Sequence, residues 1–364
     1  HGQHGANLVG DNALAGAKAG VLLRVGGDDR LARRHDPPHE AVAQLNLRIV
    51  HFARRELARH DTSGLSITVV HASQVIEMAE HPSQAVRAKP DSSMVVGMRL
   101  LRDQQADAFV SAGNSGGVLA AALASAGRIG RVKGIQRPAI STVMPTVKGF
   151  CLMLDIGANT DCKPEWLVQF ALMGSIYARA RGIERPRVAL LANGEEDTKG
   201  NAAVQAAHEM LKHLNLNFVG NVEGKDITRG LADVIVSDGF VGNVAVKTAE
   251  GVASTIFSML RQEIKARPLA SVGALLAKPA FRIVGKMLDY REYGGAPLLG
   301  VNGVVIIAHG RSDALAMENA VRVAVEAANA RLVQAIQQEM EDALTVLGNL
   351  PTGASSLLSQ DSAE

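Results

Sequence analysis

Short apolar runs alternate along the chain with longer stretches whose apolar residues recur at helical spacing. The runs are rich in β-branched residues, and each ends in a turn that contains Gly, Asn or Asp. The runs with their loops lie at 21–28, 66–72, 106–113, 149–159, 187–194, 216–224, 232–243 and 303–310. This alternation predicts an α/β fold with a doubly wound, mostly parallel sheet, and a closed eight-stranded barrel is the competing architecture.

Residues 244–292 interrupt the alternation with helical periodicity alone, which disfavours the barrel. Apolar residues recur at roughly helical spacing up to residue 266, and two prolines beyond it mark breaks. The excursion predicts a protruding helical arm over about 244–292. Its apolar middle comprises Leu269, Val272, Leu275 and Leu276, flanked by Arg267, Lys278, Arg282 and Lys286. This mixture suits a dimer contact or a membrane surface, and ordinary packing within the chain is equally compatible.

Two further segments have helical patterns. A helix with a solvated arginine face is predicted over 39–60, where the apolar face carries Val42, Leu45, Ile49 and Phe52. A long helix is predicted from about Asp313 to Leu347, with Ser312 as its N-cap. Residues 1–350 are therefore expected to form a single α/β domain with the arm inserted, and 351–364 a mobile tail.

The composition supports a helix-covered sheet and excludes several functional classes. Of the 364 residues 47% are hydrophobic and only 3% aromatic, which favours a core of Ala, Val, Leu and Ile. A net charge of +2 argues against nucleic acid as a partner. Cys151 and Cys162 match neither a disulfide framework nor a metal site, so a cytoplasmic protein is expected. There is no apolar run long enough for a spanning helix and no signal-peptide pattern.

The stretch "SAGNSGG" at 111–117 follows a buried run and precedes a helical pattern. Backbone N–H groups at a helix N-terminus favour a bound phosphate or carboxylate. Three glycines permit positive φ angles and close approach of a ligand, and the polar side chains add donors: Ser111, Asn114 and Ser115. Taken alone, the loop is better explained as a tight strand-to-helix turn.

Polar residues follow several other runs. If the sheet is parallel, the loops at Ser111, Asp155, Asn193, Asp238 and His309 meet at the carboxyl edge. The asparagines among them offer amide groups, while Lys199 and His309 supply positive charge. This set suits a phosphorylated ligand or an oxyanion. Each residue also has a structural explanation: Asp155 and Asp238 as turn caps, and Lys199 as a surface lysine.

Other kinds of chemistry find little support. Glu195 and Glu196 are adjacent on a turn and have no second acidic cluster at metal spacing, so we expect neither a metal nor a cofactor. The chain lacks the GxSxG pattern of a serine nucleophile. It also lacks the GxGxxG dinucleotide fingerprint.

Ordered motifs nevertheless resemble one family closely. They are "DSSM" (91–94), "SAGNSGG" (111–117), "GIQRPAI" (134–140), "LDIGAN" (154–159), "GEEDTKGN" (194–201), "NFVGNVEG" (217–224), "SDGFVGNVAVKTAEG" (237–251), "YGGAPLLG" (293–300) and "HG" (309–310). Over roughly 60–330 the chain resembles the bacterial phosphate acyltransferases of phospholipid synthesis.

The resemblance implies an enzyme that converts long-chain acyl-[acyl-carrier-protein] and inorganic phosphate into acyl phosphate, the donor for a membrane glycerol-3-phosphate acyltransferase. It also implies a fold akin to phosphotransacetylase and isopropylmalate dehydrogenase, a homodimer, and peripheral membrane attachment through the arm. Three features depart from the family pattern. The usual opening strand and Met-Gly-Gly-Asp are replaced by "HGQHGANLVGDNALAGAKAG", with Gln3 at the Asp position; Ser115 replaces a Thr; and the arginine-rich segment 39–60 is longer.

The expected reaction needs no covalent intermediate, because phosphate itself attacks the thioester. We assign catalytic roles to Lys199, His309 and Asn243. Substrate binding is assigned to Ser111, Gly113, Asn114, Ser115, Gly116, Asp155, Asn159 and Asp238, and membrane contact to Leu269, Val272, Leu275 and Leu276. The competing functions are a phosphotransacetylase acting on short acyl-CoA and a non-catalytic membrane-associated scaffold; a nicotinamide oxidoreductase ranks last.

Overall fold

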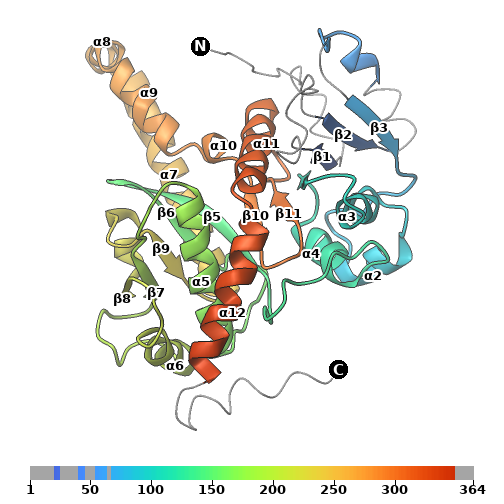
Figure 1. Cartoon of the computed structure of the whole chain (residues 1–364). Helices are drawn as coiled ribbons and strands as arrows, with labels where there is room; N and C mark the ends of the chain where they lie inside the picture. Colours follow the sequence, from blue (N-terminus) through green and yellow to red (C-terminus); the bar gives the residue numbers. More distant parts are fainter. Residues whose placement is uncertain (1–19, 25–39, 46–53, 64–66, 349–364) are drawn as a thin grey trace, which may run out of the picture.

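A computed structural model describes residues 20–24, 40–45, 54–63 and 67–348. In these ranges the strands form one sheet in the order β3-β2-β1-β4-β11-β10-β5-β6-β9-β7-β8 (Figure 1). Their bounds are β1 Gly20–Arg24, β2 Glu40–Leu45, β3 Ile67–His71, β4 Ala108–Ser111, β5 Ala139–Thr146, β6 Gly149–Leu154, β7 Val188–Leu191, β8 Phe218–Val222, β9 Val234–Val236, β10 Ala296–Leu299 and β11 Val304–Ile307. The α/β fold is confirmed, and every predicted run contains a strand.

The direction of the strands changes across the middle of the sheet. β4 and β11 are parallel to each other, and so are β6, β9, β7 and β8. Between these groups, antiparallel pairing occurs at β11–β10, β10–β5 and β5–β6. Three reversals make β4 and β11 run opposite to β6. The carboxyl ends of the strands therefore lie at different edges of the sheet. The prediction that the loops after the strands all meet at one carboxyl edge is wrong.

Helices cover both faces of the sheet. On one face a continuous core joins the sheet to α5 (Pro164–Ala180), α6 (Ala202–Leu211), α11 (Ala314–Asn329) and α12 (Leu332–Gly348). On the other face, α2 (Pro82–Ala88), α3 (Ser93–Arg102) and α4 (Ser115–Ala124) cover β4 and β11. The 3-10 helix η1 (Gly224–Arg229) and the start of α7 (Gly239–Ala266) cover β6, β9 and β7 on this second face.

Alternating side chains on the strands separate these cores. On β6, Leu152 and Leu154 belong to the continuous core, whereas Cys151 and Met153 belong to the core under η1 and α7. On the second face the two smaller cores adjoin at β5, and Ile156 packs against both. The loop that follows β6 therefore lies at the junction of the two halves of the molecule.

The segment 39–60 was wrongly predicted to be a helix. Its described part contains β2, which pairs antiparallel with β1 and parallel with β3, and a helical turn at 54–57. The helical spacing of apolar residues is outweighed here by backbone pairing with two neighbouring strands, a tertiary effect that periodicity does not contain. Residues 46–53, the N-terminal departure at Gln3 and the tail at 351–364 lie outside the described residues.

The C-terminal helical segment also differs from its prediction. It consists of α11 and α12, separated near Arg331, whose backbone has a φ of 49°. The N-cap of α11 is Asp313, whose Oδ1 accepts a hydrogen bond from the N–H of Ala316 at 3.0 Å. Ser312, the predicted cap, lies one residue earlier. Asp and Ser are comparable caps, so the sequence did not decide between neighbours.

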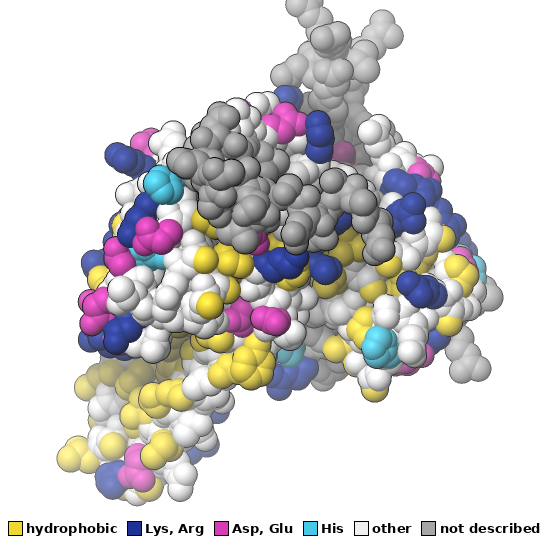
Figure 2. All heavy atoms as spheres, turned by 90° about the horizontal axis from the view of Figure 1, so that it is seen from below, with side chains coloured by type: hydrophobic (Ala, Val, Ile, Leu, Met, Phe, Trp, Pro, Cys, Tyr) yellow, Lys and Arg dark blue, Asp and Glu magenta, His cyan; other side chains and the backbone are white. Residues whose placement is uncertain are grey.

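The protruding helical arm is confirmed (Figure 1). It consists of the outer part of α7 followed by α8 (Pro268–Leu276), α9 (Lys278–Met287) and α10 (Tyr290–Tyr293). Proline stands in the first turn of both α8 and α9, where the missing N–H costs nothing. Neither α8 nor α9 contains a buried residue. Figure 2 shows the hydrophobic side chains that consequently face solvent along the arm.

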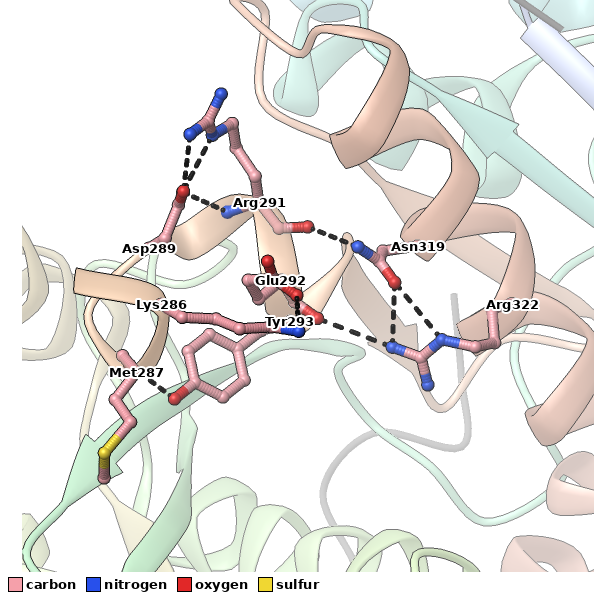
Figure 3. A network of polar contacts seen from close by, with 8 residues as sticks. All are labelled: Lys286, Met287, Asp289, Arg291, Glu292, Tyr293, Asn319 and Arg322. Atoms are coloured by element: carbon pink, nitrogen blue, oxygen red, sulfur yellow. Dashed lines mark hydrogen bonds and ion pairs between the residues drawn. The ribbon is translucent and has the colours of Figure 1, made fainter. Parts of the chain in front are cut away.

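A polar network anchors the return of the arm to the body (Figure 3). The guanidinium of Arg291 pairs with Asp289 at 2.6 Å and with Asp313 at 2.8 Å. Asn319 on α11 donates its amide to the carbonyl of Arg291 at 2.9 Å, and Arg322 donates to the Oδ1 of Asn319. Because α10 is held at both its backbone and its side chains, the base of the arm has a fixed position on α11.

Candidate active site

The loop after β6 is organised around the carboxylate of Asp155, which is fully buried. Its oxygens accept hydrogen bonds from the backbone N–H groups of Ile140, Gly157, Ala158 and Asn159, and from the side-chain amide of Asn159 at 2.9 Å. Burial raises the pKa of Asp155, and the hydrogen bonds oppose that rise. These bonds occupy both oxygens, so this carboxylate shapes the loop from inside.

Asn159 and Asn243 hold this loop against its neighbours. The amide of Asn159 also donates to the carbonyl of Pro138 at 2.8 Å, which ties the loop to the start of β5. Asn243, exposed on α7, donates to the carbonyl of Ile156 at 3.0 Å. The predicted roles of both amides toward substrate remain predictions, and in this structure both amides bind backbone carbonyls.

The turn from β9 into α7 packs directly on the Asp155 loop. Asp238 is the N-cap of α7 and accepts from the N–H of Val241 at 2.8 Å. Gly239 donates its N–H to the carbonyl of Asn159. A Cβ at Gly242 would stand 1.9 Å from the carbonyl oxygen of Asp155, so only glycine allows the helix to approach this closely. Asp155, Asn159, Asp238 and Asn243 are therefore brought together.

A second group of predicted residues lies at the ends of β4 and β11. Asn114 is the N-cap of α4: its Oδ1 accepts from the N–H of Gly117 at 3.0 Å, and its amide donates to the carbonyls of Glu77, Met78 and Glu80. Ser111 accepts from the N–H of Gly113. Ser115 opens the helix and its side chain is exposed.

The glycines of this loop serve close packing rather than unusual backbone angles. Gly113, Gly116 and Gly117 are not among the described glycines with positive φ, contrary to the sequence interpretation. A Cβ at Gly113 would meet the Met94 side chain at 2.3 Å, and one at Gly116 would meet Pro82 at 2.7 Å. The loop is glycine-rich because α2 and α3 press against it.

The loop after β11 brings positive charge to the same edge. The N–H of Ala308 donates to the carbonyl of Ser111 at 2.8 Å, so the two loops adjoin. His309 was expected to supply charge, yet burial first, and then Lys247 and Arg311, lower its pKa. The imidazole is therefore neutral near pH 7, and its Nδ1 faces the backbone N–H of Arg311 at 3.1 Å. The cations that act on His309 are Lys247, which also pairs with Glu250 at 2.8 Å, and Arg311.

Sequence analysis missed Lys247, which connects the two groups. It lies on α7 four residues after Asn243, so both side chains lie on the same side of the helix. Asn243 reaches the Asp155 loop, and the charge of Lys247 acts on His309. The sequence did contain a signal for Lys247. Asn243, Lys247 and Glu250 recur at helical spacing in "SDGFVGNVAVKTAEG".

Lys199 lies apart from His309, on the loop after β7. β7 is parallel to its neighbour β9, so this loop is at the same edge as the Asp155 and Asp238 loops. Lys199 is exposed, and its backbone N–H donates to the carbonyl of Glu196 at 2.9 Å. Among the predicted residues, Lys199 thus belongs with the Asp155 group, and His309 with the Ser111 group.

Two other groups of residues, the cysteines and a cluster of carboxylates, have structural explanations. Burial raises the pKa of both the Cys151 and Cys162 thiols to about 12, so neither provides a thiolate at neutral pH. Glu195, Glu223 and Asp226 bring carboxylate oxygens within 4.8 Å of one another. Lys225 pairs with both glutamates, and Asp226 accepts from the N–H of Glu223. Folding therefore gives Glu195 two acidic neighbours that its sequence surroundings did not predict.

Comparisons with known proteins agree with this architecture. A family model described as "Fatty acid synthesis protein" matches residues 50–335. The phosphate acyltransferase of Pelotomaculum thermopropionicum is 51% identical over 289 residues, covering 79% of this chain and 83% of the relative. That of Heliobacterium modesticaldum is 49% identical over 327 residues, covering 88% and 97%. A phosphotransacetylase from Streptococcus pyogenes has a TM-score of 0.53 at 16% identity, covering 77% of this chain and 84% of that chain.

The fold is therefore that of a phosphotransacetylase-like α/β protein, with helix N-termini, amides and cations gathered at its strand ends. The family match and the relatives near 50% identity show more than the fold. The chain belongs to the phosphate acyltransferase family and is an enzyme, a phosphate acyltransferase.

Proposed function

We propose that this chain transfers a long-chain acyl group from acyl-[acyl-carrier-protein] to inorganic phosphate. The product, acyl phosphate, would supply a membrane glycerol-3-phosphate acyltransferase in phospholipid synthesis. The observation that carries the proposal is that the loop before α4 adjoins the β11 loop, where Lys247 and Arg311 act on His309; these cations and the N-terminus of α4 favour a phosphate dianion. The description of the family in terms of fatty acid synthesis supports an acyl donor from that metabolism.

Phosphate binds at the α4 end of the site. The N–H groups of Ser115 and Gly116 occupy the first two helical positions, which have no acceptor within the helix. The exposed hydroxyl of Ser115 adds a donor. Neutral His309 accepts a proton from phosphate or a hydrogen bond, while Lys247 and Arg311 balance the charge of the dianion.

The thioester lies toward the Asp155 group. An oxygen of the hydrogen phosphate dianion attacks the thioester carbonyl, the tetrahedral oxyanion collapses and the C–S bond breaks. The departing thiolate takes up the proton that the phosphate gives up, so the products are acyl phosphate and free thiol. Asn243 and Lys199 stabilise the oxyanion and the departing thiolate, since both are exposed and lie on this side of the site. Both cysteines are protonated at neutral pH, which agrees with direct attack by phosphate.

An acidic carrier protein would dock on cations at the rim. Arg137 stacks on the ring of Trp166 at 4.9 Å from its centroid, and Lys163 lies 6.0 Å from it. Arg137 precedes Pro138, whose carbonyl binds Asn159, so this basic group adjoins the proposed thioester site. Opposite charge would accelerate association of the carrier, most strongly at low salt.

Thiol release distinguishes the proposed reaction from its competitors. We expect purified protein in phosphate buffer to release thiol from palmitoyl-[acyl-carrier-protein] at least about tenfold faster, per active site, than from acetyl-CoA. Free thiol is measured colorimetrically and acyl phosphate by its hydroxamate. Faster reaction with acetyl-CoA would instead identify a phosphotransacetylase, and the absence of phosphate-dependent release from either donor would support a non-catalytic scaffold.

The arm is proposed as the membrane contact. Leu269, Val272, Leu275 and Leu276 on α8 are 59–86% exposed, and exposed cations flank them: Arg267, Lys278 and Arg282. Apolar side chains beside cations favour a surface of anionic lipid. None of the helices in the described part of the chain has the length and apolar character needed to cross a bilayer. The homodimer is proposed as well, on the family resemblance.

Replacing Leu275 and Leu276 with Glu is expected to reduce binding to phosphatidylglycerol vesicles by at least about tenfold, because two leucines lose about 3 kcal/mol or more of apolar burial. Cosedimentation with vesicles measures the bound fraction. The matched control is Val219→Glu with Leu231→Glu, which alters exposed apolar residues outside the arm. Equal binding of the arm variant and the control would exclude α8 as the contact.

A further inference from the structure

A buried histidine lies beneath the loop that carries Lys199. His208 on α6 is 1% exposed, and its ring packs edge-on against Phe218 on β8, with centroids 5.0 Å apart. Its Nδ1 lies 3.0 Å from Oδ1 of Asn221, and its Nε2 lies 3.3 Å from Oδ1 of Asp197. The imidazole thus spans from β8 to the loop 193–200.

The ring links two partners whose orientation is fixed. The Nδ2 of Asn221 donates to the carbonyl oxygen of Glu196 at 2.8 Å. Rotating that amide would place oxygen against oxygen, so its Oδ1 faces Nδ1 of His208 and accepts from it. Asp197 accepts from Lys212 at 2.9 Å, which holds the pKa of Asp197 below its usual range. The Nε2 atom of His208 lies beside this carboxylate, so the ring connects Asn221 to Asp197.

These bonds converge on the backbone of the Lys199 loop. The carbonyl oxygen of Glu196, which binds Asn221, also accepts the backbone N–H of Lys199. Asp197 is the next residue along the loop. On the far side, Gln205 donates to the carbonyls of Thr198 and Gly200 at 2.8 and 2.9 Å. His208 thus reaches the loop through two adjacent residues, Glu196 and Asp197, which lie three and two positions before Lys199.

We propose that His208 is a positioning residue that fixes the Lys199 loop for acyl transfer. The inference rests on the proposed role of Lys199. The charged groups near the ring are Asp197 from the loop and Lys212, the C-cap of α6, with its partner Glu209; β8 contributes the neutral Asn221. Removal of the ring breaks the contacts to Asn221 and Asp197 together, so the loop loosens.

Two substitutions test the positioning role. His208→Gln keeps a side-chain amide that can donate, and His208→Phe removes both ring nitrogens. The control is His213→Gln, an exposed histidine just beyond the same helix. Equal loss of kcat in the control and in His208→Phe would overturn the proposal.

We expect kcat to fall by about 10-fold to 100-fold in His208→Phe, because slight misplacement of a catalytic group costs that much, and less in His208→Gln. The phosphate KM is expected to stay within about twofold, since phosphate binds at the other end of the site. A loss of kcat in folded protein that is accompanied by an equal rise in the phosphate KM would contradict positioning.

A double-mutant cycle connects the effect to Lys199. In a Lys199→Met background, His208→Phe is expected to lower kcat by no more than about twofold, whereas independent effects would multiply. Amide hydrogen exchange of residues 194–200 is expected to become faster in His208→Phe both with Lys199 present and in the Lys199→Met background. Unchanged exchange would overturn the positioning inference alone. Wild-type turnover in Lys199→Met would overturn the proposed role of Lys199, and the inference with it.

Discussion

Lys199→Met is expected to lower kcat for phosphate-dependent thiol release by about 100-fold to 1000-fold, the usual cost of removing one group that stabilises transition-state charge. Negative charge develops on the carbonyl oxygen and then on the sulfur, and Lys199 is the exposed cation on the β7 loop beside the Asp155 and Asp238 loops. Met retains most of the apolar stem and removes the ammonium. Initial rates with saturating phosphate and acyl-carrier-protein measure kcat.

The matched control is Lys225→Met, which removes an exposed ammonium from the same face. Lys225 pairs with Glu195 and Glu223, so its charge is already balanced within the protein. We expect this control to change kcat by less than about twofold, as exposed ion pairs contribute little. Equal turnover in the two variants would remove Lys199 from the chemistry and leave Lys247 and Arg311 as the cations of the site.

The sequence predicted the strands well because a buried strand is a local property. Each β-branched run, such as 149–159, contains a strand that is buried by its own apolar residues. Pairing is not local. β2 had a helical pattern and became a strand because β1 and β3 supply its hydrogen-bond partners. β10 is only four residues long and was recognised solely as part of a motif.

Residues of the candidate site could be named from the sequence, but their arrangement in space was predicted wrongly. Asn114 was predicted to be a donor in its loop and Asp238 a turn cap, whereas both are helix N-caps whose side chains accept from N–H groups three residues away. The convergence of all the loops assumed parallel strands, and the reversals at β10 and β5 separate Ser111 from Asp155. Only the position of α7 reconnects the two groups, and that position depends on packing against Ile156 and β5.

The pKa of His309 shows the same limit of prediction from the sequence. A histidine after a strand is a reasonable source of positive charge when it is seen as sequence. Its ring is partly buried beside Lys247 and Arg311, which come from α7 and from its own loop. Those neighbours disfavour a third positive charge and give His309 the neutral form, which accepts a proton. The sequence contains all three residues, but not the distance between Lys247 and the β11 loop.

Asp155→Asn is expected to destabilise the protein by about 3 kcal/mol or more, because each buried donor left without an acceptor costs about 1–3 kcal/mol. The carboxylate accepts from the N–H groups of Ile140, Gly157, Ala158 and Asn159, and from the amide of Asn159. An amide has one accepting oxygen, and its NH2 would face donors. Urea denaturation followed by circular dichroism measures the free energy of unfolding.

Asp238→Asn is the matched control, since it makes the same chemical change at the neighbouring loop. Asp238 accepts from a single N–H at the start of α7, and Asn caps helices about as well as Asp. We expect its free energy of unfolding to change by less than about 0.5 kcal/mol. A comparable loss in both variants would show that charge alone, rather than the number of donors around Asp155, determines the effect.

The same variant decides between a structural and a substrate role for Asp155. A carboxylate that contacts substrate would leave stability intact when replaced by Asn and would change KM or kcat alone. If the carboxylate instead shapes the loop, its replacement by Asn lowers both stability and activity. Asn159 and the carbonyl of Ile156, which binds Asn243, then move with the loop. We therefore expect stability and kcat to fall together in Asp155→Asn. In the remaining folded fraction, phosphate KM should change little, since the proposed phosphate donors come from the start of α4 and not from this loop.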